Sequence, residues 1–156
     1  METLPSGVML ALDLGAARIG VAACDSARIL AYPVATVAAD DQWIDRVLAL
    51  ADEHQAAVIV VGYPLALDGR VGVAATAIGD KAGSLSARTS TPIWLVDERL
   101  TTAEAHRRLR ETGHSAKTDR MMIDAQAAVG ILDTMLQALR QGRIIGRRLD
   151  NKEAHD

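Results

Sequence analysis

Cysteine, aromatic residues and long apolar runs are all scarce in this chain, and each scarcity excludes a class of protein. The single cysteine, Cys24, cannot form an internal disulfide, and its apolar surroundings are typical of a buried thiol in a cytosolic protein. Two Trp, two Tyr and no Phe are too few for a platform on which single-stranded bases stack. No apolar run is long enough to cross a bilayer, and no signal peptide is apparent at the N-terminus. We therefore expect one cytoplasmic domain from these 156 residues.

The net charge of −3 by itself disfavours a nucleic-acid partner, but the charge is unevenly distributed along the chain. Residues 99–148 carry ten Arg or Lys against five acidic residues, a local charge of +5, so the remainder carries −8. A basic third on an acidic body suits a surface that binds a polyanion. Helix ends also collect Arg as an ordinary solvated face, and both interpretations stay open at this point.

The chain is organised around an apolar run that ends in a carboxylate. Residues 8–12 are all apolar and predict a strand that is buried on both faces, and Asp13 follows them directly. Gly15 and Gly20 permit a sharp turn and a short apolar return strand. An Asp here can simply close a turn, but a buried carboxylate without a partner is costly. Asp13 therefore becomes a candidate site residue if other carboxylates reach the same place.

The remaining pattern predicts a mixed α/β fold. Pro33 cannot donate to a ladder hydrogen bond, so its strand belongs at a sheet edge. Three antiparallel strands followed by parallel ones form a mixed five-stranded sheet flanked by helices. We expect a single domain over residues 1–148, followed by a polar tail over residues 149–156. The chain from Gly142 onward is expected to be frayed. The predicted elements are strands at 29–37, 58–61 and 93–96, helices at 71–88, 101–113 and 121–141, a helix that Asp40 or Asp41 caps, and an irregular segment at 114–120.

Two further carboxylates are predicted to lie near Asp13. Glu98 follows the strand at 93–96, and parallel strands end at the same edge of a sheet. Asp124 precedes Ala128 by one helical turn, so it points with the apolar stripe of the last helix toward the sheet. Three carboxylates repel one another without a cation, and all-oxygen ligands suit Mg²⁺ or Mn²⁺. Such a site beside a basic surface is typical of phosphoryl transfer.

Four short motifs follow one another in order along the chain, from about residue 10 to residue 136. Together they resemble the YqgF/RuvX family, Holliday-junction-resolvase-like proteins described as pre-16S ribosomal RNA nucleases with a ribonuclease H-like fold. The resemblance implies that Asp13, Glu98 and Asp124 are catalytic ligands of Mg²⁺ or Mn²⁺. The motifs are Asp13-x-Gly15-x-x-Arg18-Ile19-Gly20, Val61-Gly62-x-Pro64-x-x-x-Asp68-Gly69, Asp97-Glu98-Arg99-Leu100-Thr101-Thr102 and Asp124-x-x-Ala127-Ala128.

The same resemblance implies a set of substrate contacts. Arg18, Arg99 and the helix start at Thr101 and Thr102 would meet phosphate. Further along that helix, Arg107, Arg108 and Arg110 form either a substrate track or a solvated face, and we favour the track, with Arg107 and Arg108 as its substrate-binding residues.

Three positions depart from the family pattern. Ala17 and Ala66 stand where the family often has polar residues, which would remove two contacts to the substrate. Ala127 stands where related resolvases carry a further carboxylate, which weakens the case for a second tightly held metal ion.

The resulting prediction is a metal-dependent nuclease that processes the 5′ end of pre-16S ribosomal RNA, as a monomer or a weak homodimer. A nuclease of branched or single-stranded DNA is one alternative, because phosphate contacts carry no sugar preference. A non-catalytic RNA-binding protein of ribosome biogenesis is another. A nucleotide-binding ATPase is disfavoured, since that fold needs two domains around a cleft. We further expect Asp124 to be strained without metal, because two other carboxylates and an apolar stripe nearby both disfavour its charged form.

Overall fold

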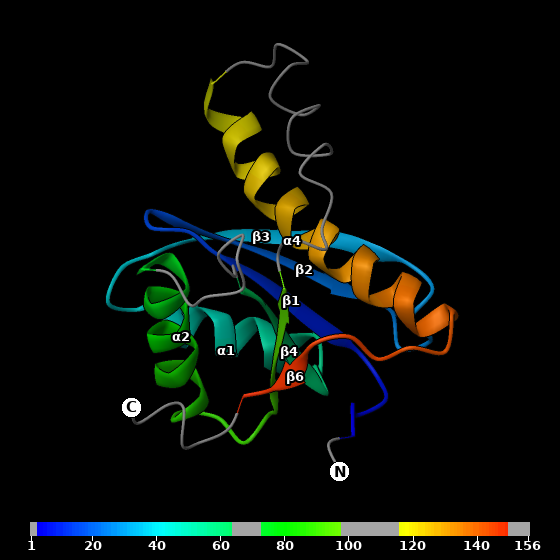
Figure 1. The fold of residues 1–156 in the computed structure, drawn as a ribbon. Coiled ribbons are helices and arrows are strands. Elements are labelled where there is room, and N and C mark those ends of the chain that lie inside the picture. The colour runs from blue at the N-terminus through cyan, green and yellow to red at the C-terminus, as the bar shows by residue number, and fades with distance from the viewer. Residues whose placement is uncertain (1–2, 64–72, 98–115, 150–156) are drawn as a thin grey trace.

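The computed structural model describes residues 3–63, 73–97 and 116–149, and in this part of the chain a single sheet lies between helices (Figure 1). The sheet has six strands in the order β3-β2-β1-β4-β5-β6. This confirms the mixed α/β prediction, with one strand more than expected. The elements are β1 (Met9–Leu14), β2 (Arg18–Cys24), β3 (Ala31–Ala38), α1 (Trp43–Glu53), β4 (Val58–Tyr63), α2 (Val73–Ser86), β5 (Ile93–Asp97), α4 (Ala116–Arg140) and β6 (Arg147–Arg148).

Strand directions follow the predicted pattern. β1 pairs antiparallel with β2 and parallel with β4, which in turn pairs parallel with β5. Leu12 is aligned with Val61, and Val61 with Leu95, so the carboxyl ends of these three strands lie at the same end of the sheet. β3, which contains Pro33, is an edge strand, as the missing ladder donor requires.

The two faces of the sheet carry separate cores. Successive strand residues point to opposite faces, so Leu10 and Leu12 pack with α1 and α2, whereas Met9 and Ala11 pack with α4. On the α4 face, Cys24 is buried, its Sγ accepts the Met9 N–H at 3.3 Å, and burial raises the pKa of the thiol. The expected buried cysteine is therefore confirmed. The predicted apolar stripe of α4 is buried as well, at Ala128, Ile131, Leu132, Met135 and Leu136.

Helix α4 begins at Ala116, inside the segment predicted to be irregular. The prediction was wrong for residues 116–120 because their mixture of charged and small residues lacks an apolar stripe. In Figure 1 the first turns of α4, drawn in yellow, project beyond the sheet. The helix predicted at 101–113 lies outside the described residues. No helix among the described residues is long and apolar enough to cross a membrane.

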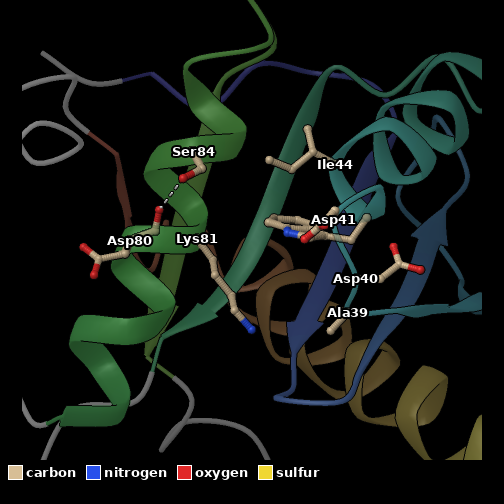
Figure 2. Close-up of a pocket in the computed structure, with 8 residues that line it drawn as sticks. Ala39, Asp40, Asp41, Ile44, Asp80, Lys81 and Ser84 are labelled. Carbon is tan, nitrogen blue, oxygen red and sulfur yellow. Dashed lines mark hydrogen bonds between the residues drawn. The ribbon is translucent and has the colours of Figure 1, made fainter.

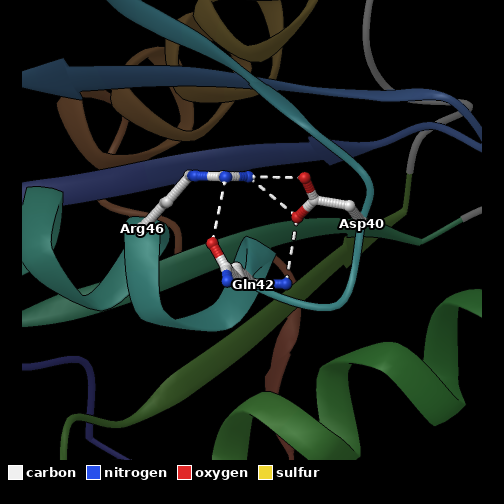
Figure 3. Close-up of polar contacts among 3 residues, drawn as sticks. All are labelled: Asp40, Gln42 and Arg46. Atoms are coloured by element: carbon white, nitrogen blue, oxygen red, sulfur yellow. Dashed lines mark hydrogen bonds and ion pairs between the residues drawn. The ribbon is translucent and has the colours of Figure 1, made fainter.

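The N-terminus of α1 is held by a side chain outside the helix (Figure 3). Gln42, not Asp40 or Asp41, is the N-cap residue, and its side chain makes no capping bond. Asp40 instead accepts the Gln42 N–H at 2.9 Å and two bonds from Arg46, at 2.8 and 2.9 Å. Those bonds hold the pKa of Asp40 below its usual value. The predicted cap was therefore wrong in position, because an Asp two residues before the N-cap residue can bond to that residue and to the first turn.

The chain after α4 returns to the sheet as β6, where the sequence predicted frayed chain. Arg147 and Arg148 pair antiparallel with Leu95 and Trp94 of β5. The Trp94 indole donates to the Ile145 carbonyl at 2.8 Å, and buried Leu149 donates its N–H to Ile93 at 2.8 Å. The sequence does not predict this strand, because both of its residues are exposed arginines and only their backbone pairs with the sheet, so no apolar pattern marks it.

Replacing Gly146 by Ala should detach β6. Its φ of +79° is left-handed, and a Cβ there would lie 2.3 Å from the Leu95 carbonyl oxygen and 2.8 Å from the Trp94 Nε1. Gly142→Ala is the control, since its φ of +73° is also left-handed but nothing lies within 4 Å of the added atom. Urea unfolding should give a loss of about 1–2 kcal/mol for the control and about 3 kcal/mol or more for Gly146→Ala. Equal losses would contradict this packing of β6.

Candidate active site

The β1–β2 hairpin carries Asp13 and Arg18 to one end of the sheet. Its turn is tight: the Gly15 N–H donates to the Asp13 and Arg18 carbonyls at 3.1 and 3.0 Å. A Cβ on Gly15 would lie 2.5 Å from the Arg18 carbonyl oxygen, so the turn requires glycine. Two neighbouring elements hold the hairpin, through bonds from Lys81 Nζ of α2 to the Gly15 carbonyl (3.3 Å) and from the Ala39 N–H to the Ala17 carbonyl (3.0 Å). The backbone at Arg18 is thereby fixed.

Helix α4 touches the sheet directly at Gly20. A Cβ at this position would lie 1.7 Å from the Asp124 carbonyl oxygen and 3.0 Å from the Ala125 nitrogen. Only glycine therefore allows the helix backbone to approach β2 this closely. Gly20 is also the residue of β2 that faces Asp13 across the antiparallel ladder. This contact brings Asp124 to the same part of the sheet as Asp13.

Asp13 and Asp124 lie on the same face of the sheet. Asp13 has the strand parity of Met9 and Ala11, which pack against α4. It is partly buried, as is Asp124, whose side chain is 23% exposed. Next to Asp124 in the helix, Ala125, Ala127 and Ala128 are buried, so the small residue at 127 fits a packed position.

The Asp124 carboxylate is paired with a cationic side chain. Its Oδ2 accepts a bond of 2.6 Å from Nε of Arg18, which stands at the start of β2 and is 42% exposed. The motifs predict a metal ligand at Asp124 and a phosphate contact at Arg18, but they do not predict this contact, because 106 positions separate the two residues. The expectation that Asp124 is strained did not include this partner, and Glu98, one of the two carboxylates it invoked, lies outside the described residues.

The other predicted site residues fall outside the described part of the chain. Glu98 is the residue that follows Asp97, the last residue of β5. Within the described residues, no group of three or more His, Cys, Asp or Glu side chains is placed to hold a metal ion. The predicted residues that lie outside are Glu98, Arg99, Thr101, Thr102, Arg107 and Arg108.

A pocket of about 430 Å³ lies on the opposite face of the sheet, between α1, α2 and the end of β3 (Figure 2). Lys81 extends from α2 into this pocket, whereas Asp80 points away from it. Neither Asp13 nor Asp124 lines it. No local sequence pattern indicates Lys81, because its partner Gly15 is 66 residues distant. The lining residues are Ala39, Asp40, Asp41, Trp43, Ile44, Asp80, Lys81 and Ser84.

The structure is a mixed sheet with helices on both faces, and carboxylates from β1 and α4 lie at the carboxyl ends of its parallel strands. This arrangement is that of a ribonuclease H-like fold. Among solved structures, the T. thermophilus RuvC chain in complex with a Holliday junction substrate has this fold, at a TM-score of 0.57 and 14% identity. The match covers 90% of this chain and 99% of that one.

Comparison of the sequence with known proteins shows which family within this fold class the chain belongs to. Residues 7–138 match the RuvX family, described as Holliday junction resolvase, and the chain belongs to that family. A Cutibacterium acnes protein named as a pre-16S rRNA nuclease is 41% identical over 91% of this chain and 89% of its own length. A Mycobacterium tuberculosis protein of the same name is 46% identical over 83% of this chain and 78% of its own. The protein is therefore a hydrolase that acts on ester bonds.

Replacing Gly20 by Ala should disrupt the contact between β2 and α4. We expect a loss of at least about 3 kcal/mol of unfolding free energy, since two backbones must separate to admit the methyl group. Gly79→Ala in α2 is the matched control, because its Cβ would lie 3.7 Å from the Tyr63 ring, an ordinary contact. That substitution should be neutral or stabilise by about 0.5–1 kcal/mol in urea unfolding. A Gly20→Ala variant as stable as wild type would contradict the close approach.

Proposed function

We propose that this protein is a divalent-metal-dependent nuclease that processes the 5′ end of pre-16S ribosomal RNA in the cytoplasm. The observation that carries the proposal is the placement of Asp13 and Asp124 on one face of the sheet, on either side of Gly20. The names of the relatives from Cutibacterium acnes and Mycobacterium tuberculosis support ribosomal RNA as the substrate.

The donor set fits a hard divalent cation. Asp13 and Asp124 supply carboxylate oxygens, which Mg²⁺ and Mn²⁺ prefer, and a cationic group, the Arg18 guanidinium, already binds Asp124. We assign Glu98 as the third ligand, since it follows β5 in the sequence, and β5 ends at the same end of the sheet as the strand that carries Asp13. When bound, the metal would polarise the phosphodiester and supply hydroxide near neutral pH.

The protein's own residues would bind and orient the nucleic acid. We assign the phosphate contacts to Arg18, Arg99, Thr101 and Thr102, with Arg107 and Arg108 extending the track. A helix start offers unpaired N–H groups to an anion, which suits the two threonines. We further propose that the protein acts as a monomer or a weak homodimer.

The charge distribution over the described elements supports an approach of nucleic acid from the side of residues 140–148 rather than from the side of α1. Residues 140–148, at the end of α4 and in β6, contain four Arg and no acid, and all four are exposed. Residues 40–53, at and in α1 on the opposite face, contain five exposed acids and one Arg. A polyanion is attracted to the first surface and repelled by the second.

Cleavage of a DNA junction is the second candidate, and the family description as Holliday junction resolvase favours it. Matched RNA and DNA substrates, each with and without Mn²⁺, separate the two. Faster cleavage of pre-16S RNA supports the first function, and faster cleavage of branched DNA supports the second. Binding without cleavage of either would favour the non-catalytic RNA-binding alternative.

Asp13→Asn and Glu98→Gln should each abolish metal-dependent cleavage, because each removes a ligand charge and keeps the side-chain shape. We expect a loss of at least about 100-fold in rate, with the unfolding midpoint close to wild type. Asp52→Asn, an exposed carboxylate in α1, is the control and should cleave normally. Full activity in a folded Asp13 or Glu98 variant would contradict the metal assignment.

The double variant Arg107→Gln/Arg108→Gln tests the substrate track. If both side chains contact phosphate, the slope of log affinity against log salt should flatten by about 0.7 per contact on single-stranded RNA. The control is Arg46→Gln/Arg88→Gln, which also removes two charges, from arginines paired with Asp40 and Asp45. An unchanged slope in the first variant would make Arg107 and Arg108 a solvated face.

A further inference from the structure

Arg18 and a metal ion would need the same carboxylate. The Arg18 Nε donates to Oδ2 of Asp124 at 2.6 Å, which is the geometry of a direct, charge-assisted bond. Asp124 is also the residue to which the proposed function assigns a metal ligand, and the inference below rests on that proposal. A guanidinium bound to Oδ2 would meet a divalent cation at the same atom with like-charge repulsion.

We propose that Arg18 competes with the divalent cation for Asp124, so that metal binding releases the Arg18 guanidinium to a phosphate of the nucleic acid. The side chain can make this exchange because it is 42% exposed, while its backbone is held in the hairpin. The released guanidinium therefore stays beside the site and needs no change of fold. Arg18 is in this way a positioning residue for Asp124 as well as a contact for phosphate.

The competition couples metal and nucleic-acid binding. A phosphate that binds Arg18 removes the competitor from Asp124 and raises the metal affinity, and by linkage the metal raises the affinity for nucleic acid by the same factor. Exposed ion pairs are weak, so the expected factor is about two- to fivefold. Such a device keeps Asp124 neutralised when metal and substrate are absent.

The first test measures Mn²⁺ affinity without nucleic acid, by titration calorimetry of the whole chain. Arg18→Gln should bind Mn²⁺ about two- to fivefold more tightly than wild type. Arg88→Gln is the matched control for the lost charge, since it pairs with Asp45, and its affinity should be unchanged. In the Asp124→Asn background, Arg18→Gln should give no gain, whereas a general charge effect would persist there.

The second test follows the Arg18 Nε–H by NMR, with the signal assigned by its loss in Arg18→Gln. In chelator, Asp124→Asn should shift this signal, because the 2.6 Å bond to Oδ2 is replaced. Saturating Mg²⁺ should shift the wild-type signal in the same direction. A signal that does not respond to Mg²⁺ would overturn the proposed exchange.

The outcomes separate this inference from the proposed function. If Mn²⁺ affinity depends on Asp13 and Asp124 but Arg18→Gln binds equally well or more weakly, the competition is wrong and the metal site stands. If neither Asp13→Asn nor Asp124→Asn changes Mn²⁺ affinity, the metal assignment itself fails. A tighter Arg18→Gln variant, with the gain abolished by Asp124→Asn, supports both.

Discussion

The contact between the backbone of α4 and Gly20 of β2 is the constraint on which the site depends. Because no side chain separates the two elements at this point, the Asp124 carbonyl lies against the strand and its carboxylate lies beside the end of the sheet. The buried stripe of α4 then holds the helix along the same face. A larger residue at position 20 would move the helix, and with it one of the two described carboxylates, away from Asp13.

Charge compensation follows from that contact. Packing two acidic residues on one face of a partly buried surface raises their free energy unless a cation lies nearby. Arg18 supplies one cation from within the chain, and the hairpin turn at Gly15 keeps its backbone in place. The pair is partly exposed, so breaking it costs little free energy, as the exchange that we propose for Arg18 requires.

The two faces of the sheet differ in the helices that cover them and in the charges that they present. One packs α1 and α2 around a core of strand side chains, and its surface beside α1 is acidic. The other packs α4 and presents Asp13, Asp124 and Arg18, with exposed Arg140 further along at the end of α4. A nucleic acid that approaches the carboxylates along α4 meets the exposed Arg140 and Arg143 at and just after the end of that helix. The net charge of −3 does not reveal this acidic surface beside α1, because it sums the charges of the whole chain.

The amino-acid sequence by itself determined the strands, the edge position of β3 and the apolar stripe of α4, because each follows from local periodicity or a single residue such as Pro33. It also determined the family, through motifs that keep their order. Only the tertiary structure decided the pairing of Arg18 with Asp124, the contact of Gly20 with α4, the sixth strand and the start of α4 at Ala116. Three of these four features are contacts between residues tens of positions apart, and local patterns carry no information about which distant backbone or charge a residue will meet. The fourth is a helix start without an apolar stripe, in turns that project beyond the sheet.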